Sequence, residues 1–484
     1  MKMECDVLII GSGAGGACVA DVLTRAGLDV LMIEEGPELK AGETLSTAHE
    51  ALPRLWRAGG LTMALGPTPI SYAEGRCLGG GTEINSGIFQ RTPAELLEAW
   101  AKKYRIVDFN AHSLAPYYDR ATTAVKVSEG TDDFAEDSGI LRRGGEAMGW
   151  KVSTLDQAQL SVNGPHGGSL AYVSQKKLSA KNALLPAAKT RGLRILSGCR
   201  ALRLETKGKH VTRVHVMHGK TREAIQVKHV FLCAGAIYTP FLLRQSGFRA
   251  AQIGSSLRMH PTIKCLAFFN REVNAQQSRL PLCAVTQFMP DQRLGGSVFM
   301  PAFYGMALAE SWEARGMHLF DMKNAAMYYA MARAEGRGSV HALPFLPDPV
   351  VRYRLTPEDR ANLAMSAGRL AQALFAAGAK KVYPSLRGHT GWSDPAQARH
   401  FGERGLQEGQ AHLMSVHLFS SCPPGENAAI TATSSYGQLR GASNVTIADA
   451  SQIPEAPGVN PQATVMALAF RNAEHFLQTR KKAA

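Results

Sequence analysis

The sequence has no apolar run of transmembrane length, and its cysteines form no closely spaced pair. Hydrophobic residues make up 45% of the 484 residues and charged residues 19%, a balance typical of globular proteins. Without about 20 consecutive apolar residues, we expect no stable membrane insertion. The first apolar stretch is short and follows Glu4, so we expect no signal peptide and a cytoplasmic location.

The eight cysteines are scattered and include no Cys-x-x-Cys motif. Such spacing argues against a disulfide framework and against a zinc site, so we expect buried free thiols and no bound metal. Internal repeats and low-complexity segments are also lacking. Two or three domains with a large core fit this length.

Acidic residues are fewer than basic ones, 40 against 54, which gives a net charge of +14. Lysine and arginine are spread along the chain, and aromatic residues, 7% of the total, do not alternate with them in a stripe. We therefore expect no nucleic-acid partner. A basic surface can still steer anionic ligands toward the protein.

The first forty residues read as a βαβ unit. An apolar strand at Val7–Ile10 leads into a Gly-x-Gly-x-x-Gly turn at Gly11–Gly16, a helix at Ala17–Ala26 and a second strand at Val30–Ile33. Glu34 follows, where a carboxylate can bind ribose hydroxyls. This order predicts a dinucleotide site, with the pyrophosphate at the helix N-terminus. The acid disfavours NADP, while the motif leaves FAD and NAD both open.

A second glycine-rich segment spans Gly75–Gly87, with four small residues at Gly79–Thr82 and an asparagine at Asn85. Such a segment is neither a stable helix nor a strand interior. It suits a place where backbone lies against something flat or charged. A flexible loop is the alternative.

The middle of the chain contains β-strand patterns that return to the first sheet. Alternating residues over 193–227 predict a small meander, followed by a buried strand at 230–234. A strand added so late makes the first domain discontinuous. The stretch 268–331 is rich in aromatic residues and methionine, and Thr356 is typical of the N-cap of a helix that ends at Ala377.

The last 75 residues contain the second group of unusual residues. His417 lies five positions before Cys422, and a predicted strand at 445–449 ends in Asp449. Asn460 is typical of a helix N-cap, and Pro461 is typical of the first helical position. A histidine is often structural, and Asn460 could serve as a cap alone.

Four blocks together resemble the glucose–methanol–choline (GMC) family of FAD oxidoreductases: Gly11–Glu34, Gly75–Gly87, Cys233–Pro261 and His417–Pro461. The resemblance covers the whole chain. It implies an α/β protein, α+β overall, with a discontinuous Rossmann-type FAD-binding domain and a substrate domain on a mainly antiparallel sheet.

The expected domain boundaries follow from the order of these blocks. Residues 1–90, 185–262 and 408–484 are assigned to the FAD-binding domain, and residues 91–184 and 263–407 to the substrate-binding domain.

The resemblance implies FAD as cofactor, with Glu34 at the adenosine ribose and Asp449 near the ribityl–pyrophosphate region. Some family members attach FAD through a histidine before the signature asparagine. Ile84 stands there in this chain, so we expect non-covalent FAD. The expected cofactor-binding residues are Gly11, Gly13, Ala14, Gly16, Glu34, Glu35, Arg76, Gly80, Gly81, Thr82, Asn85, Ala234, Gly235, Asp449, Ala450, Asn460, Pro461 and Gln462.

His417 and Asn460 are the expected catalytic pair. Removing hydride from an alcohol carbon also requires removal of the hydroxyl proton, and a histidine is the usual base near neutral pH. An asparagine amide can hold the same oxygen in a reactive geometry. The helix that starts at Asn460 would place its N-terminus toward the charge that develops on reduced flavin.

The sequence therefore predicts an FAD-dependent alcohol oxidoreductase that acts on a small-molecule alcohol and passes electrons to O2 or a quinone-like carrier. Alternatives are a lyase or decarboxylase of the same fold with non-redox FAD, and a non-catalytic flavoprotein. The substrate stays open between an apolar alcohol, a sterol, a sugar and a natural-product hydroxyl. The role of the loop 163–168, which contains His166, also stays open.

Overall fold

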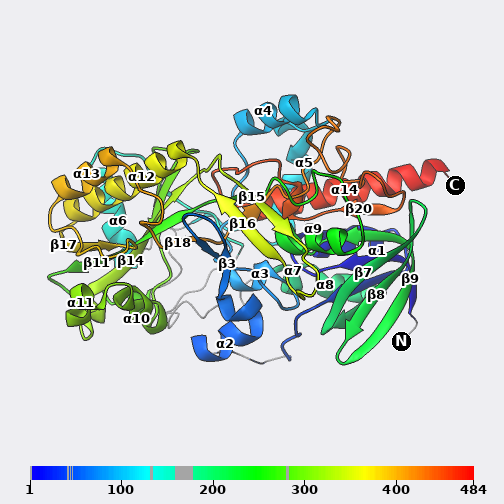
Figure 1. The fold of residues 1–484 in the computed structure, drawn as a ribbon, viewed down its shortest axis with the longest axis horizontal. Helices are drawn as coiled ribbons and strands as arrows, with labels where there is room; N and C mark the ends of the chain where they lie inside the picture. The colour runs from blue at the N-terminus through cyan, green and yellow to red at the C-terminus, as the bar shows by residue number, and fades with distance from the viewer. Residues whose placement is uncertain are drawn as a thin grey trace.

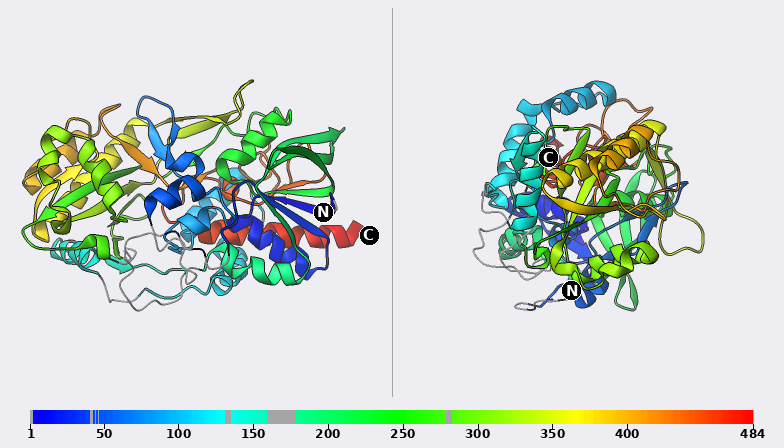
Figure 2. Two further views of the ribbon diagram at one scale, coloured as in Figure 1. Left: turned by 90° about the horizontal axis from the view of Figure 1, so that it is seen from below. Right: turned by 90° about the vertical axis from the view of Figure 1, so that its left-hand side faces the viewer.

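The computed structural model describes residues 3–40, 43, 45, 47–130, 135–158, 178–278 and 283–483. The loop 163–168 lies outside these residues. Two sheets organise the chain, one at each end of an elongated molecule, and both termini lie at the end of the first sheet (Figures 1 and 2). Within the described ranges, no helix is both long and apolar enough to cross a bilayer.

The first sheet has the strand order β6-β2-β1-β9-β8-β7, and β20 also pairs with β9. Strand β9 has three partners: its first half pairs antiparallel with β8, its second half pairs parallel with β1, and its last residues also pair parallel with β20. The parallel strands are β1 (Glu4–Ile10), β2 (Val30–Glu34), β6 (Arg194–Ser197), β9 (Thr221–Leu232) and β20 (Val445–Ile447), and the meander adds β7 (Cys199–Lys207) and β8 (His210–His218).

Alternate residues of β1 face opposite sides of this sheet. Val7 and Ile9 belong to a buried cluster with helices α1 (Ala14–Arg25) and α14 (Gln462–Ala483). Leu8 and Ile10 belong to a different cluster with the meander and α9 (Gly235–Gln245). Because β1 is buried on both faces, its sequence is a continuous apolar run.

The second sheet is mainly antiparallel and has the order β3-β4-β18-β11-β14-β13-β12-β5, with β17 also paired to β11. Its strands are β3 (Thr62–Ala64), β4 (Ile70–Tyr72), β5 (Val152–Thr154), β11 (Thr262–Phe269), β12 (Cys283–Val285), β13 (Gln292–Gly296), β14 (Ala325–Ala332), β17 (Ala379–Pro384) and β18 (Leu413–Ser415). Two short ribbons pair β10 (Arg258–Met259) with β19 (Leu418–Phe419) and β15 (Arg337–His341) with β16 (Val350–Arg354).

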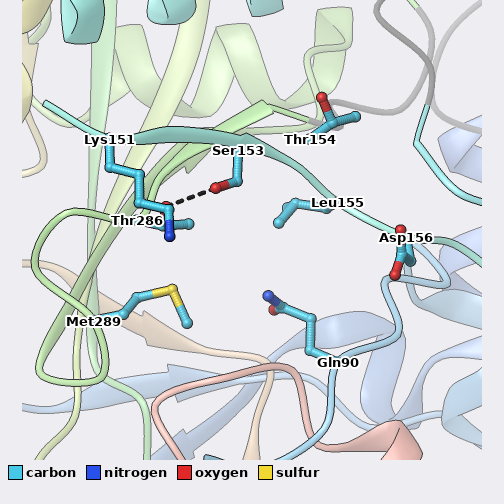
Figure 3. Close-up of a pocket in the computed structure, with 8 residues that line it drawn as sticks. All are labelled: Gln90, Lys151, Ser153, Thr154, Leu155, Asp156, Thr286 and Met289. Carbon is cyan, nitrogen blue, oxygen red and sulfur yellow. Dashed lines mark hydrogen bonds between the residues drawn. The ribbon is translucent and has the colours of Figure 1, made fainter.

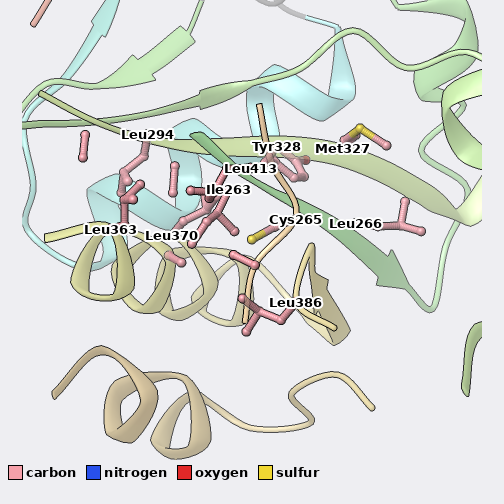
Figure 4. Close-up of a cluster of buried hydrophobic side chains, with 14 of the residues drawn as sticks. Ile263, Cys265, Leu266, Leu294, Met327, Tyr328, Leu363, Leu370, Leu386 and Leu413 are labelled. Carbon is pink, nitrogen blue, oxygen red and sulfur yellow. The ribbon is translucent and has the colours of Figure 1, made fainter. Parts of the chain in front are cut away.

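Helix α12 (Pro357–Ala376) covers the second sheet. Thr356 forms a capping box with Asp359, as the sequence pattern indicated, and Pro357 takes the first helical position. Leu363 and Leu370 point from α12 toward Ile263 and other buried strand residues (Figure 4). The remaining helices are α2 (Ala48–Leu55), α3 (Gly81–Ile84), α4 (Ala94–Tyr104), α5 (Ala111–Ala124), α6 (Glu136–Ala147), α7 (Ala180–Ala183), α8 (Leu185–Thr190), α10 (Pro301–Ala309), α11 (Trp312–Arg315) and α13 (Pro395–Arg404).

Packing crosses the expected domain boundaries at two places. Helices α4 and α5 contribute Trp100 and Tyr118 to the buried cluster of the first sheet, although 91–184 was assigned to the second domain. Conversely, β4 and β18 belong to the second sheet, although their residues were assigned to the first domain. All eight cysteines are buried thiols that are not joined in disulfides.

Candidate active site

The turn between β1 and α1 requires glycine for close backbone approach. Gly11 has φ +100°, and a Cβ there would lie 2.3 Å from the carbonyl oxygen of Cys233. A Cβ on Gly16 would lie 2.0 Å from the carbonyl oxygen of Gly11. Gly13 is the N-cap of α1 and offers no side-chain cap, which leaves the first N–H groups of the helix, beginning at Ala14, available to a ligand.

The second glycine segment faces this turn. Gly80 has φ +54°, and a Cβ on it would lie 2.9 Å from the Cα of Gly13. A Cβ on Gly81 would meet no heavy atom within 4 Å. The hydroxyl of Thr82 donates to the carbonyl oxygen of Gly79 at 2.6 Å and so stabilises the turn of this segment. The two glycine segments therefore lie against each other, with open space beside Gly81.

Glu34 is buried at the end of β2, beside the glycine turn. One carboxylate oxygen accepts hydrogen bonds from the backbone N–H and the hydroxyl of Ser12, at 3.1 and 2.6 Å. The other accepts from the N–H of Gly36 at 2.8 Å. Burial raises the pKa of Glu34 despite these donors. A carboxylate can accept about four hydrogen bonds, so Glu34 can still accept one from a ribose hydroxyl.

Glu35 and Arg76 lie in an ion cluster. The carboxylate of Glu35 is paired with both Nη atoms of Arg57, at 3.1 and 2.8 Å, and with Nε of Arg76 at 3.1 Å. Arg200 approaches the same carboxylate at 3.7 Å. Burial is the largest single effect and opposes ionisation of Glu35, but Arg57, Arg200 and Arg76 together outweigh it and lower the pKa of Glu35. Contact of Glu35 or Arg76 with the cofactor stays a prediction.

Asp449 joins two blocks that are far apart in sequence. Its carboxylate accepts from the N–H of Gly235 at 3.0 Å and from the hydroxyl of Thr239 at 2.5 Å, both on α9, which follows Ala234. It also accepts from the N–H and hydroxyl of Ser451, next to Ala450. Burial raises the pKa of Asp449. Asp449 thus fixes the start of α9.

Asn85 and Gln462 connect the second glycine segment to the last helix. The amide of Asn85 donates to Oε1 of Gln462 at 2.6 Å, across 377 positions in the sequence. Helix α14 begins at Gln462, so Pro461 precedes the first helical residue. The side chain of Asn460 bonds elsewhere, to Arg293 and His417, rather than acting as the expected N-cap.

His417 and Asn460 come together as the sequence analysis predicted. Nε2 of His417 lies 3.2 Å from Nδ2 of Asn460. Nδ1 of His417 lies 3.0 Å from Nδ1 of His260, whose Nε2 accepts from the backbone N–H of Gly458 at 3.0 Å. Four groups thus form one chain of contacts, in which His417 and Asn460 are each partly exposed.

Arg293 fixes the orientation of the Asn460 amide. Its Nη1 donates to Oδ1 of Asn460 and to Oε1 of Gln90, the latter at 2.6 Å. With its oxygen held by Arg293, Asn460 directs its NH2 group toward His417. Burial first, and the charge of Arg293 second, lower the pKa of His417 to about 3. His417 is therefore a neutral imidazole at physiological pH.

Sequence reasoning missed three neighbours of this pair. His260 lies in the third sequence block, directly before Pro261, and this His-Pro motif is the signal that could have found it. Arg293 and Gln90 carry no motif, and nothing local in the sequence distinguishes them from other polar residues.

These residues fit the FAD that the resemblance implied. The facing glycines leave a cradle with open space beside Gly81, and the N-terminus of α1 directs N–H groups toward it. Glu34 lies beside the same turn, at the position expected for the ribose. The pair His417 and Asn460 lies where the first helical turn of α14 begins. Within the described ranges, no group of histidine, cysteine and carboxylate residues could hold a metal ion.

Comparison with known proteins decides the family. The N-terminal GMC oxidoreductase profile matches residues 52–262 and the C-terminal one matches residues 335–469. An uncharacterized GMC-type oxidoreductase of Sinorhizobium fredii is 49% identical over 99% of this chain and 95% of its own length. The chain belongs to the GMC oxidoreductase family. The family expected from the four sequence blocks is confirmed.

More distant relatives extend the comparison. A long-chain-alcohol oxidase of Arabidopsis thaliana is 25% identical over 97% of this GMC chain and 68% of its own length. Pyridoxine 4-oxidase from Mesorbium loti superposes with a TM-score of 0.76 at 19% identity, covering 98% of this chain and 99% of that one. The likeness to the solved structure confirms the predicted fold class, a Rossmann-type domain joined to a substrate domain.

Proposed function

We propose that this GMC protein oxidises an alcohol with FAD, with His417 as general base and Asn460 as the group that holds the substrate oxygen. One observation carries the proposal: His417 Nε2 and Asn460 Nδ2 lie 3.2 Å apart at the start of α14. Names of relatives support it, since they include a long-chain-alcohol oxidase, a pyridoxine 4-oxidase and an aryl-alcohol oxidase.

In this proposal, FAD when bound accepts hydride at N5, and the chain's own residues manage the proton. The hydroxyl enters between His417 and Asn460, so that the asparagine NH2 donates to its oxygen. In the tautomer of His417 that carries its proton on Nδ1, Nε2 is unprotonated and accepts the hydroxyl proton. The low pKa of His417 keeps this imidazole neutral before substrate arrives. Either O2 or a quinone-like carrier would reoxidise the cofactor.

Anaerobic mixing of the purified protein with a panel of alcohols tests the reaction. We expect alcohols to bleach the flavin absorbance, and His417→Ala to slow bleaching by about 10²- to 10⁴-fold. His400→Ala is the matched control, because His400 is exposed on α13. Admitting O2 or a quinone afterwards identifies the acceptor.

Two results would contradict the proposal. A lyase or decarboxylase with non-redox FAD would show turnover without bleaching by any alcohol. A non-catalytic flavoprotein would keep its biological function after His417→Ala.

A further inference from the structure

Arg293 is a buried cation without a carboxylate partner among the described residues. It lies on β13 with a relative exposure of 1%. Its Nη1 donates to two neutral amide oxygens, those of Gln90 and Asn460. Nε and Nη2, which together form one edge of the guanidinium, have no hydrogen-bond partner in the part of the chain that the structure describes. An arginine stays charged at any physiological pH, so its burial calls for an anion.

Other buried arginines of the chain are better compensated. Arg315, also 1% exposed, is paired with the carboxylate of Glu310 at 2.8 Å. Arg471 donates to the carbonyl oxygen of Ser435 at 2.8 Å and lies over the ring of Tyr436 at 4.0 Å. Arg293 differs from both, and it is the one in contact with the proposed catalytic pair.

A cavity of about 380 Å³ adjoins Arg293 through Gln90. The side chain of Gln90 points into this cavity while its Oε1 accepts from Arg293 (Figure 3). Most of the wall is polar, and the residues that line it are Gln90, Lys151, Ser153, Thr154, Leu155, Asp156, Thr286 and Met289. Such a wall suits a small polar molecule better than a long alkyl chain.

We propose that the substrate is a short hydroxy acid, whose carboxylate binds Arg293 after the amide of Gln90 moves aside. The inference rests on the proposed alcohol oxidation and names its substrate class. A carboxylate presents two oxygens that match two parallel N–H groups of a guanidinium. Here these are on Nη1, which Gln90 would vacate, and on Nη2, which has no partner among the described residues. The charge of the carboxylate lets it displace the neutral amide. Because Arg293 also contacts Asn460, the reacting hydroxyl lies only a few bonds from the carboxylate.

The same arrangement links substrate binding to the base. Arg293 is the charged group that lowers the pKa of His417 after burial. A carboxylate bound to Arg293 would offset that charge and make His417 a stronger base when a substrate of this class is present.

Binding of acetate and acetamide to the FAD-loaded enzyme tests the anion site, with the change in flavin absorbance as the readout. We expect acetate to bind about 10- to 100-fold more tightly than acetamide, and Arg293→Met to abolish the difference. Arg293→Lys, which keeps the charge, should retain part of it. Gln90→Glu supplies an internal carboxylate to Arg293 and should prevent acetate binding. Lys151→Met removes an exposed cation from the cavity wall and should preserve the discrimination.

Glycolate and glycolamide, compared as reductants of the flavin, test the substrate class. We expect glycolate to be preferred by a similar factor in wild type and not in Arg293→Met. Equal binding of acetate and acetamide to wild type, or discrimination that survives Arg293→Met, would overturn the anion site. A changed flavin spectrum in Arg293→Met with unchanged discrimination would assign Arg293 to the cofactor instead.

The two proposals fail in different ways. If acetate binds through Arg293 but no hydroxy compound bleaches the flavin, the anion site stands and alcohol oxidation is wrong. If neutral alcohols bleach the flavin and acids bind no better than their amides, alcohol oxidation stands and the anion site is wrong.

Discussion

At the scale of single residues, the contacts of His260 determine which nitrogen of His417 is free. Both ends of the imidazole pair face N–H donors, Gly458 at His260 and Asn460 at His417. One ring proton can lie between the two Nδ1 atoms, and the second must lie at one end. When Gly458 donates to Nε2 of His260, the second proton lies on Nε2 of His417, and His417 is no base there. His417 is a base at Nε2 only in the other tautomer, in which Nε2 of His260 carries that proton and the hydrogen bond from Gly458 is lost.

His260 is therefore a positioning residue, and substituting it should alter proton transfer. We expect His260→Phe to slow anaerobic flavin reduction by about 100-fold, because Nδ1 of His417 loses its partner. His260→Asn should keep most of the activity, since its side-chain oxygen can accept the Nδ1 proton of His417. Stopped-flow absorbance measures both rates. Equal losses in the two variants would show that His260 only fills space.

The low pKa of His417 makes a pH prediction. A lowered histidine pKa means that the ring stays neutral until the pH approaches about 3. Flavin reduction should therefore show no acid limb from His417 between pH 8 and 5. Removing the charge in Arg293→Met should raise this pKa only in part, because burial, the larger cause, remains, so that the acid limb moves to a higher pH than in wild type. A wild-type limb near pH 6.5 that Arg293→Met leaves in place would contradict this.

At the scale of elements, the start of α1 depends on contact with the segment after β20. A Cβ on Gly15 would lie 1.8 Å from the carbonyl oxygen of Ala448, which precedes Asp449. Any side chain at Gly15 must push α1 away from this segment and from the glycine cradle.

We expect Gly15→Ala to reduce FAD loading and to cost about 1–3 kcal/mol of stability. The ratio of flavin to protein absorbance and thermal unfolding measure the two effects. Gly305→Ala on α10 is the control, because a Cβ there would meet no atom within 4 Å. Normal FAD content in Gly15→Ala would show that α1 can shift without loss of the cradle.

Some elements could be predicted because their signals are local. The glycine turn at Gly11–Gly16 and the capping box at Thr356 are each specified by a few neighbouring residues, and both lie where the sequence indicated. The start of α14 depends on long-range contacts as well. Asn460 is a good cap by type, but Arg293 and His417 take its side chain, and no local pattern reports that competition.

At the scale of the whole molecule, the candidate site lies where segments of both sheets meet. We propose a discontinuous FAD-binding domain built from 1–90, 185–262 and 408–484. The packing of α4 and α5 on the first sheet, and of β4 and β18 in the second, indicates that its boundaries interleave with those of the substrate domain.

Because the cradle joins segments from three parts of the chain, FAD should stabilise the fold as a whole. At a free FAD concentration 100 times its dissociation constant, we expect about 2.7 kcal/mol of stabilisation. Thermal unfolding of the apoprotein, with and without added FAD, measures this stabilisation.

The absence of a histidine at Ile84 predicts that FAD is bound non-covalently. Acid precipitation should therefore release all the flavin, and flavin retained in the pellet would show a covalent link.

The sequence alone determined the family and the fold class, and it predicted the pair His417 and Asn460. Turn glycines, caps and strand patterns act over a few residues, and the order of four blocks is specific. The tertiary structure alone decided what surrounds that pair. Arg293 lies 167 positions from Asn460 and 203 from Gln90, and His260 lies 157 from His417. Burial and pairing of charges depend on such long-range contacts, so the environment of the proposed base could be read only from the folded chain.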